Sequence, residues 1–305
     1  MFTKKLGTFF LRVIQELPIK EVVSINGQID SKAAISVFDR GFLYGDSVYE
    51  VTLTYNKIPF LLDEHLDRLY RSARSIHMEF SFTREELIKD IYRVIEKLEG
   101  DRQYIRIIVT RGAGEINLDP SAATKNNLVI IARNLPEYPT YWYEKGVSMI
   151  ITDVLRNSKR SMDPGVKSGN YLNNVLAMAE AKEKKAFDAI MLNYKGNITE
   201  GTTSNIWIVE DKKFITPPLD AGLLGGITRK TLLLIASKNN LIVSEENISP
   251  ERLKAADECF LTSSTKEIVP IISVDDSPIG SGVPGPQTKI LHKIYKNFVE
   301  ESLKK

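Results

Sequence analysis

The sequence is poor in the residues that build disulfides and metal centres. It contains one cysteine, Cys259, and three histidines, at positions 65, 77 and 292. A single cysteine excludes an internal disulfide and a cysteine-based metal site, and it fits a reducing compartment such as the cytoplasm. Because the few histidines form no closely spaced set with carboxylates, we expect no zinc or iron centre.

Long apolar runs and a strong excess of one charge are also missing. No stretch is long enough to span a bilayer, and Arg12, Gln15 and Glu16 interrupt the apolar residues near the N-terminus, which argues against a signal peptide. Residues 6–17 instead predict a short amphipathic helix. The net charge is only +2 and no Lys/Arg run forms a patch. We therefore expect a cytoplasmic protein that binds neither membranes nor nucleic acid.

The length of the chain predicts two domains. Its 305 residues exceed what one hydrophobic core usually serves, and the composition is that of an ordinary globular protein. Strands and helices alternate, which predicts an α/β (α+β) fold. A stretch with several prolines, 135–146, is typical of a linker. We expect an N-terminal α/β domain over 1–137, with 1–20 as an extension, and a larger C-terminal domain over 138–305.

Local signals predict several elements. Two hairpins, over 22–29 and 47–62, are expected to turn at Asn26-Gly27 and at Asn56-Lys57. Helices are expected over 63–76 with Asp63 as the cap, over 83–98 with a capping box at Thr83, and from about 228 with Thr228 as the cap. Strands are expected over 104–112 and 127–134.

A lone lysine marks the stretch DPGVKSGNYLNN (163–174). Lys167 has no carboxylate beside it and precedes a helical pattern that runs from Leu176 to Lys185. The N-terminal end of a helix dipole disfavours a positive charge, so a lysine there is pushed toward its neutral form. Two interpretations follow from the stretch itself: a solvated surface lysine, or an amine that attacks a carbonyl carbon.

Three later stretches bear on this choice. Glu200 follows a Gly196-Asn197 turn, where it is either an ordinary hairpin glutamate or a site residue. GLLGGITRK (222–230) is a glycine-rich loop that enters a helix, and free N–H groups at such a helix start attract an anion, typically a phosphate. Residues 262–265 add hydroxyls at the end of a strand. None of the three is decisive alone.

Together with four other segments they resemble one family. Over roughly residues 22–300 the chain resembles the class IV pyridoxal-phosphate aminotransferases, which include branched-chain aminotransferases, D-amino-acid aminotransferases and aminodeoxychorismate lyase. Seven collinear segments carry the resemblance: DRGFLYGDSVYE (39–50), EHLDRL (64–69), YIR (104–106), KSGNYLNNVLA (167–177), TEGTTSN (199–205), GGITR (225–229) and TSSTKEIVP (262–270).

The resemblance implies a fold-type IV enzyme with pyridoxal 5'-phosphate between its two domains. Lys167 resembles the catalytic lysine that links covalently to this cofactor, and Glu200 resembles the partner of its pyridine nitrogen. Tyr171 resembles the phenol that donates to its ring oxygen. The residues implied to hold the phosphate are Arg68, Ile227, Thr228, Ser263 and Ser264.

The resemblance also implies a ping-pong transamination between a hydrophobic, branched-chain L-amino acid and 2-oxoglutarate. In that interpretation Arg106, beside Tyr104, acts with Tyr44 on the distal carboxylate of glutamate, and the α-carboxylate lies near Ser264 and Thr265. A D-amino-acid enzyme is the alternative, with Tyr49 and Arg111 as its carboxylate trap. The stretch GAGEINLDPSAA (112–123), however, supplies no histidine to complete that trap.

Two further implications concern the lyase and the assembly. Aminodeoxychorismate lyase, a third possibility, typically lacks a tyrosine at the position of Tyr171. Active sites of the family borrow residues from a second subunit, so the resemblance implies a homodimer or a larger even assembly whose partners are small amino and 2-oxo acids.

Overall fold

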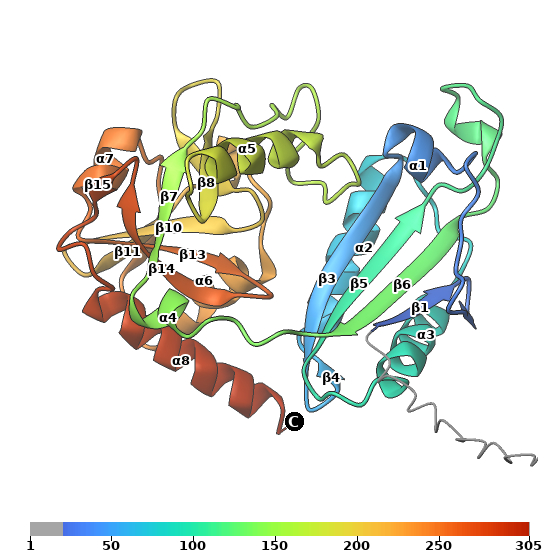
Figure 1. Cartoon of the computed structure of the whole chain (residues 1–305), viewed down its shortest axis with the longest axis horizontal. Helices are drawn as coiled ribbons and strands as arrows, with labels where there is room; N and C mark the ends of the chain where they lie inside the picture. Colours follow the sequence, from blue (N-terminus) through green and yellow to red (C-terminus); the bar gives the residue numbers. More distant parts are fainter. Residues whose placement is uncertain (1–20, 305) are drawn as a thin grey trace, which may run out of the picture.

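Two β-sheets organise the chain, one in each half of the sequence (Figure 1). The computed structural model describes residues 21–304. The first sheet is antiparallel throughout, with strand order β2-β1-β6-β5-β3-β4. Its strands are β1 (Glu21–Ile25), β2 (Gln28–Ile29), β3 (Ser47–Tyr55), β4 (Ile58–Pro59), β5 (Gln103–Thr110) and β6 (Asn127–Asn134), and the short helix α1 (Arg40–Tyr44) precedes β3.

Two helices, α2 (Leu62–Ser75) and α3 (Arg84–Glu96), cover one face of the first sheet. Strand β5 alternates between buried and half-buried residues, which is the period-two pattern of a strand with one covered face. Ile105, Ile107 and Val109 are buried in a cluster with leucines and isoleucines of both helices. This apolar layer is the core of the N-terminal domain.

The second sheet contains nine strands in mixed orientation, in the order β12-β11-β10-β13-β14-β7-β8-β9, with β15 beside β14. Because β9 pairs with both β8 and β10, the strands from β10 round to β9 close on themselves. The strands are β7 (Val147–Ile151), β8 (Asp188–Leu192), β9 (Ile198–Gly201), β10 (Asn205–Glu210), β11 (Lys213–Thr216), β12 (Val243–Glu245), β13 (Glu258–Ser263), β14 (Glu267–Val274) and β15 (Ser277–Pro278).

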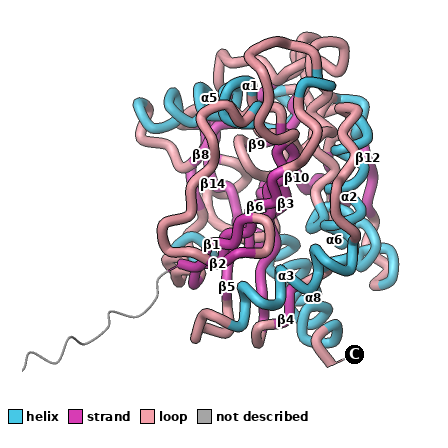
Figure 2. Tube along the Cα trace, turned by 90° about the vertical axis from the view of Figure 1, so that its right-hand side faces the viewer, coloured by secondary structure: helices cyan, strands magenta, loops and turns pink. Residues whose placement is uncertain are grey.

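Helices surround the second sheet. They are α4 (Tyr141–Glu144), α5 (Leu172–Glu183), α6 (Ile227–Lys238), α7 (Pro250–Ala255) and α8 (Pro286–Ser302). In the view turned by 90°, α6 and α8 lie along the same side of the molecule as α2 of the first domain (Figure 2). The two-domain arrangement confirms the expected α/β (α+β) class, and the predicted boundary at 137/138 falls between β6 and α4.

Several local predictions are confirmed. The first hairpin turns at Asn26-Gly27 and the second at Asn56-Lys57, and all four residues have positive φ, as a tight hairpin turn requires. Thr83 caps α3 in a complete capping box with Glu86.

Two predicted helix caps are wrong. Helix α2 begins at Leu62, one residue before Asp63, and no side chain of the described residues caps it; the Asp63 carboxylate accepts from Arg84 at 2.8 Å instead. Helix α6 has Gly226 as its N-cap, so Thr228 is already the second helical residue. The segment 135–146, expected as a linker, connects β6 to β7 and contains helix α4.

The predicted helix over 6–17 lies outside the described residues. Within residues 21–304, none of the helices combines the length and the apolar character that crossing a bilayer requires. In the same part of the chain, no group of three His, Cys, Asp or Glu side chains is arranged to hold a metal ion.

Candidate active site

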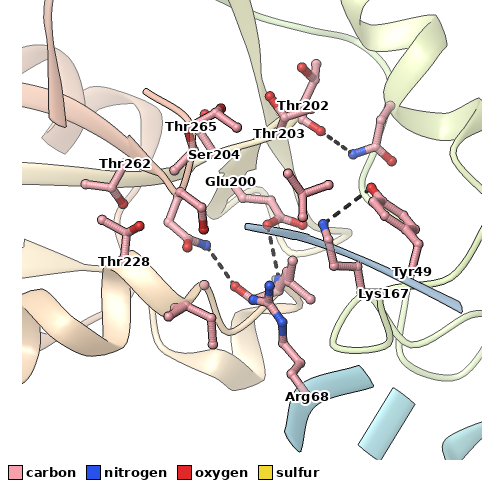
Figure 3. Close-up of a pocket in the computed structure, with 18 of the residues that line it drawn as sticks. Tyr49, Arg68, Lys167, Glu200, Thr202, Thr203, Ser204, Thr228, Thr262 and Thr265 are labelled. Atoms are coloured by element: carbon pink, nitrogen blue, oxygen red, sulfur yellow. Dashed lines mark hydrogen bonds between the residues drawn. The ribbon is translucent and has the colours of Figure 1, made fainter. Parts of the chain in front are cut away.

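A cavity of about 190 Å³ receives side chains from both domains (Figure 3). Twelve residues expected at a common site line it: Tyr49, Arg68, Tyr104, Arg106, Lys167, Tyr171, Glu200, Ile227, Thr228, Ser263, Ser264 and Thr265. They come from β3, α2 and β5 of the first domain, and from the 167–171 loop, β9, the start of α6 and the turn after β13 in the second. The structure therefore brings together residues that are far apart in the sequence.

The loop that carries Lys167 is held by hydrogen bonds to β3 and α2. The Tyr49 N–H donates to the Lys167 carbonyl at 3.0 Å, and the Lys167 N–H donates to Ser72 Oγ at 3.2 Å. A Cβ at Gly169 would lie 2.2 Å from Ser47 Oγ, so a larger residue here requires the Ser47 side chain to move. Helix α5 begins at Leu172, five residues after Lys167, so the predicted placement of Lys167 at a helix start is wrong.

The Lys167 amine lies between two phenols. Its Nζ donates to the hydroxyls of Tyr49 at 3.3 Å and Tyr171 at 3.4 Å, and the two rings meet edge to face at 5.3 Å. Burial raises the pKa of Tyr49. Burial would do the same for Tyr171, but the Lys167 charge and the hydrogen bond from Tyr49 outweigh it and lower the pKa of that phenol. Within residues 21–304, Lys167 has no carboxylate partner.

Glu200 enters the cavity from β9 with both carboxylate oxygens held. Arg156 Nε donates to one oxygen at 2.8 Å, and the Leu224 N–H donates to the other at 3.1 Å. Arg156 itself does not line the cavity, and its Nη1 donates to Asn173 Oδ1 at 3.1 Å. Sequence reasoning missed Arg156, because it lies 44 residues before Glu200 in a loop without a motif.

Arg68 is held by a second buried pair. Its guanidinium donates two hydrogen bonds to Glu50, at 2.6 and 2.8 Å, and a third to the Gly225 carbonyl at 2.9 Å. His65 lies 2.8 Å from Glu50. Burial alone would raise the pKa of Glu50, but Arg68 and His65 outweigh it and lower that pKa, while burial lowers the pKa of His65. Arg68 is thereby attached to the glycine-rich loop.

The start of α6 offers hydrogen-bond donors to the cavity. No side chain of the described residues caps this helix, and its first residues, Ile227 and Thr228, line the cavity. A Cβ at Gly226 would lie 2.1 Å from Asn205 Oδ1, so a larger residue here requires the Asn205 side chain to move. Together with the hydroxyls of residues 262–265 and the Arg68 guanidinium, this helix start offers donors and a positive charge that can hold an anion.

Arg106 adds a second guanidinium to the cavity lining, from β5. Its guanidinium lies 4.1 Å from the centre of the Tyr49 ring and donates to the Tyr104 hydroxyl at 3.4 Å. No salt bridge joins it to a carboxylate of residues 21–304. Val51 lies beside it in the cavity lining, so this end combines a free positive charge with apolar and aromatic surface.

Tyr44 and Arg111 do not line this cavity. Arg111 donates to Asp46 at 2.7 Å and to the carbonyls of Ile76 at 2.7 Å and His77 at 2.9 Å. Its guanidinium is therefore already used within the N-terminal domain. The suggested trap of Tyr49 with Arg111 does not form at the cavity of this chain.

Comparisons with known proteins agree with this geometry. A family model described as amino-transferase class IV matches residues 47–274. The chain is 38% identical, over 90% of its length and 96% of the other, to a Methanocaldococcus jannaschii protein provisionally named a branched-chain-amino-acid aminotransferase. It is 35% identical to a D-alanine aminotransferase of Bacillus licheniformis, over 91% and 96%. The solved branched-chain amino acid aminotransferase of Escherichia coli superposes with a TM-score of 0.88 at 29% identity, over 92% and 95%.

Proposed function

The chain belongs to the class IV aminotransferases, and on that premise we propose that it moves an amino group between a hydrophobic, branched-chain L-amino acid and 2-oxoglutarate. Its fold is that of the fold-type IV enzymes, and it is a pyridoxal-phosphate-dependent transaminase. Solved relatives carry phosphopyridoxyl-glutamate or pyridoxamine phosphate. The substrate pair is the proposal.

The residues of the cavity fit this cofactor. Arg68, the uncapped start of α6 and the hydroxyls of Ser263 and Ser264 together suit a phosphate, because they combine a positive charge with several donors. Lys167 suits the covalent link, and Glu200 suits the pyridine nitrogen. Tyr171 suits the ring oxygen. When bound, pyridoxal phosphate supplies a carbonyl carbon for amines and a ring that withdraws electrons from the substrate α-carbon.

The chain's own residues would then control where protons go. The Lys167 amine, held by two phenols, could take the proton from the substrate α-carbon as a general base and deliver it to the former carbonyl carbon of the cofactor as a general acid. The Glu200 carboxylate is fixed in place, because Arg156 and the Leu224 N–H hold both of its oxygens. A carboxylate there favours a protonated partner nitrogen.

The observation that carries the substrate proposal is the environment of Arg106. The Arg106 guanidinium lines the cavity and has no carboxylate partner among the described residues, so it suits the second carboxylate of glutamate or 2-oxoglutarate. The adjoining surface of Val51 and Tyr49 suits a branched aliphatic side chain. One cavity can thus accept both substrates of the cycle in turn.

Single half-reactions test this proposal. The cofactor-loaded protein is mixed with one amino acid at a time, and amino transfer is followed by the absorbance of the cofactor. L-Leucine, L-isoleucine and L-glutamate should all react, whereas D-alanine should not. Reaction with D-alanine but not with L-leucine would overturn the proposal.

A D-amino-acid aminotransferase is the second candidate. The relative from Bacillus licheniformis is a D-alanine aminotransferase, and Tyr49 lies at the cavity as that alternative requires. The position of Arg111 weighs against it, because its donors bond to Asp46 and to backbone carbonyls. The lyase is less well supported, since Tyr171 is present and contacts Lys167.

We also propose that the protein works as a homodimer or a larger even assembly in the cytoplasm. The outer face of α5 exposes Leu172, Val175 and Leu176, and such apolar surface supports an interface between subunits. The single cysteine is buried and free, as is usual in a reducing compartment. Sedimentation of the purified protein gives the number of subunits directly.

A further inference from the structure

A buried carboxylate that the proposed reaction does not use lies close to the cavity. Glu267 is the first residue of β14 and is only 8% exposed. One of its oxygens accepts from the Tyr55 hydroxyl at 2.9 Å and from Arg102 Nη2 at 3.0 Å, and the other lies 3.1 Å from His292 Nε2. We name Glu267, Tyr55, Arg102 and His292 the Glu267 cluster.

The members of the Glu267 cluster come from four separate parts of the fold. Tyr55 ends β3 and Arg102 precedes β5, so both belong to the N-terminal domain, whereas His292 belongs to α8 of the C-terminal domain. The residue before Glu267 is held by α4, in the segment that connects β6 to β7: the Tyr143 hydroxyl donates to the Lys266 carbonyl at 3.3 Å. The end of the turn before β14 is therefore held by both domains and by the segment that joins them.

The backbone of Glu267 is in an unfavourable conformation. Its φ is +58°, in the left-handed region that a residue with a side chain rarely adopts. Such a conformation persists when surrounding contacts impose it. Burial would raise the pKa of Glu267, but hydrogen bonds from His292 and Tyr55 and the charge of Arg102 outweigh burial and lower that pKa. The side chain is thus a charged anchor at a strained point of the chain.

This point is coupled directly to the cavity lining. Glu267 pairs with Ser263 across the β13–β14 hairpin, and the Lys266 N–H donates to Ser263 Oγ at 3.1 Å. Ser263 Oγ lies 3.4 Å from Thr265 Oγ1. Residues 263–265 all line the cavity. A displacement of Glu267 must therefore move the hydroxyls and N–H groups of this turn.

We propose that Glu267 is a positioning residue, which joins both domains to the turn 263–265 and holds that turn in the arrangement that binds the cofactor phosphate and the substrate carboxylate. The inference rests on the proposed function of that turn. It adds an interdomain connection through which a change in the packing of the two domains alters cofactor affinity.

The test compares two buried glutamates on the second sheet. Glu267→Gln keeps the size of the side chain and removes its charge. Glu258→Gln is the matched control, because Glu258 is 7% exposed and accepts from the N–H groups of Gln287 and Thr288 at the start of α8 without contacting the cavity. Dissociation of pyridoxal phosphate from the loaded full-length protein is measured alongside thermal unfolding, KM and kcat.

We expect Glu267→Gln to weaken pyridoxal-phosphate binding by about tenfold, the equivalent of one charge-assisted hydrogen bond, and to raise KM more than it lowers kcat. Glu258→Gln should lower the unfolding temperature but leave cofactor binding and KM unchanged. Equal losses of stability in both variants, with wild-type cofactor affinity in Glu267→Gln, would overturn the inference.

Tyr55→Phe is the second variant, in case Glu267→Gln folds poorly. It removes only the oxygen that lies 2.9 Å from Glu267, and we expect a smaller loss of cofactor affinity, about threefold. Unchanged affinity in Tyr55→Phe would contradict a role for the contact from β3. Because cofactor dissociation is measured without any amino acid, the result does not depend on which substrate the enzyme prefers.

Discussion

Two buried arginine–glutamate pairs border the same cavity, and they present opposite charges to it. In the pair from the N-terminal domain, Arg68 lines the cavity and Glu50 lies behind it. In the pair from the C-terminal domain, Glu200 lines the cavity and Arg156 lies behind it. The first pair presents a positive charge beside the start of α6, and the second presents a negative charge on the opposite domain.

The difference shows how one type of interaction can serve two purposes. A buried ion pair costs desolvation energy, and by itself it is weak support for stability. Each partner behind the cavity instead fixes the geometry of the partner in front. The Arg68 pair suits a phosphate and the Glu200 pair suits a protonated nitrogen, so a molecule with both groups has its orientation set at two ends.

Lys167 lies in the cavity that both pairs border, so its loss should have the largest effect. We expect Lys167→Ala to lower turnover by on the order of 10³-fold, because it removes the amine that we propose transfers the proton. Borohydride reduction of the loaded wild-type protein, followed by peptide mapping, should place a pyridoxyl label on Lys167.

Lys266→Ala provides the matched control for this label. The Lys266 amine lies near the cavity, 3.3 Å from Thr203 Oγ1, yet its removal should leave the label on Lys167. A pyridoxyl label on Lys266 or any other lysine would contradict the role of Lys167.

Glu200→Gln breaks the second pair without changing its shape. We expect the proton-transfer half-reaction with the best amino acid to slow by on the order of 10²-fold, while the cofactor remains bound. Single-turnover kinetics measure this rate. The corresponding change in the first pair, Glu50→Gln, should lower cofactor affinity more than it lowers that rate, and equal effects in both variants would mean that the two pairs do not differ in purpose.

Arg106 sharpens the comparison, because no carboxylate of the described residues pairs with it. A charge-assisted contact made only to glutamate and 2-oxoglutarate is worth about 2–4 kcal/mol. We therefore expect Arg106→Ala to raise the apparent binding constant for these two substrates by about a hundredfold, at about 1.4 kcal/mol per decade, and to affect leucine far less.

Arg111→Ala is the control for Arg106. Its guanidinium bonds to Asp46 and to the carbonyls of Ile76 and His77, so the change should lower the unfolding temperature without a preference among substrates. If Arg111→Ala instead weakened every substrate alike, and D-alanine reacted with the parent protein, the D-amino-acid alternative would replace the proposed function.

Twelve residues that line the cavity could be predicted together only from the resemblance that seven collinear segments carry, because each stretch alone also fitted an ordinary structural role. Local signals predicted the hairpin turns and the cap at Thr83. The supporting partners were not predicted, because Arg156 meets Glu200 only after the loop and β9 have folded together. Glu50 gave one usable signal, a charged residue within a buried strand.

The errors also have physical causes. Asp63 was expected to cap α2, but the N-cap is Leu61, two residues earlier, and the Asp63 carboxylate pairs with Arg84. Arg111 was implied by the resemblance as part of the D-amino-acid alternative, yet its guanidinium bonds to Asp46 and to the carbonyls of Ile76 and His77. Tertiary packing decided both cases, and neither could be read from neighbouring residues.

The smallest expected effect concerns the pH dependence of the first pair. The folded-state pKa of Glu50 is lowered, so the stability that its charge contributes is present above the ordinary glutamate value of 4.5 and is lost as pH falls below it. Linkage gives a loss of about 1 kcal/mol at pH 4 relative to pH 7. Glu50→Gln cannot lose this contribution, so the difference in unfolding free energy between the wild-type residue and Gln should shrink by about that amount.

His65 must be removed from this measurement. Its pKa is lowered by burial, so its own protonation also destabilises the fold as pH falls below 6.5. Urea unfolding is therefore compared in two cofactor-free proteins that both carry His65→Gln, one with Glu50 and one with Glu50→Gln, at pH 7 and at pH 4. A difference that stays constant between the two pH values would show that folding does not shift the pKa of Glu50, and it would contradict stabilisation of the carboxylate by Arg68.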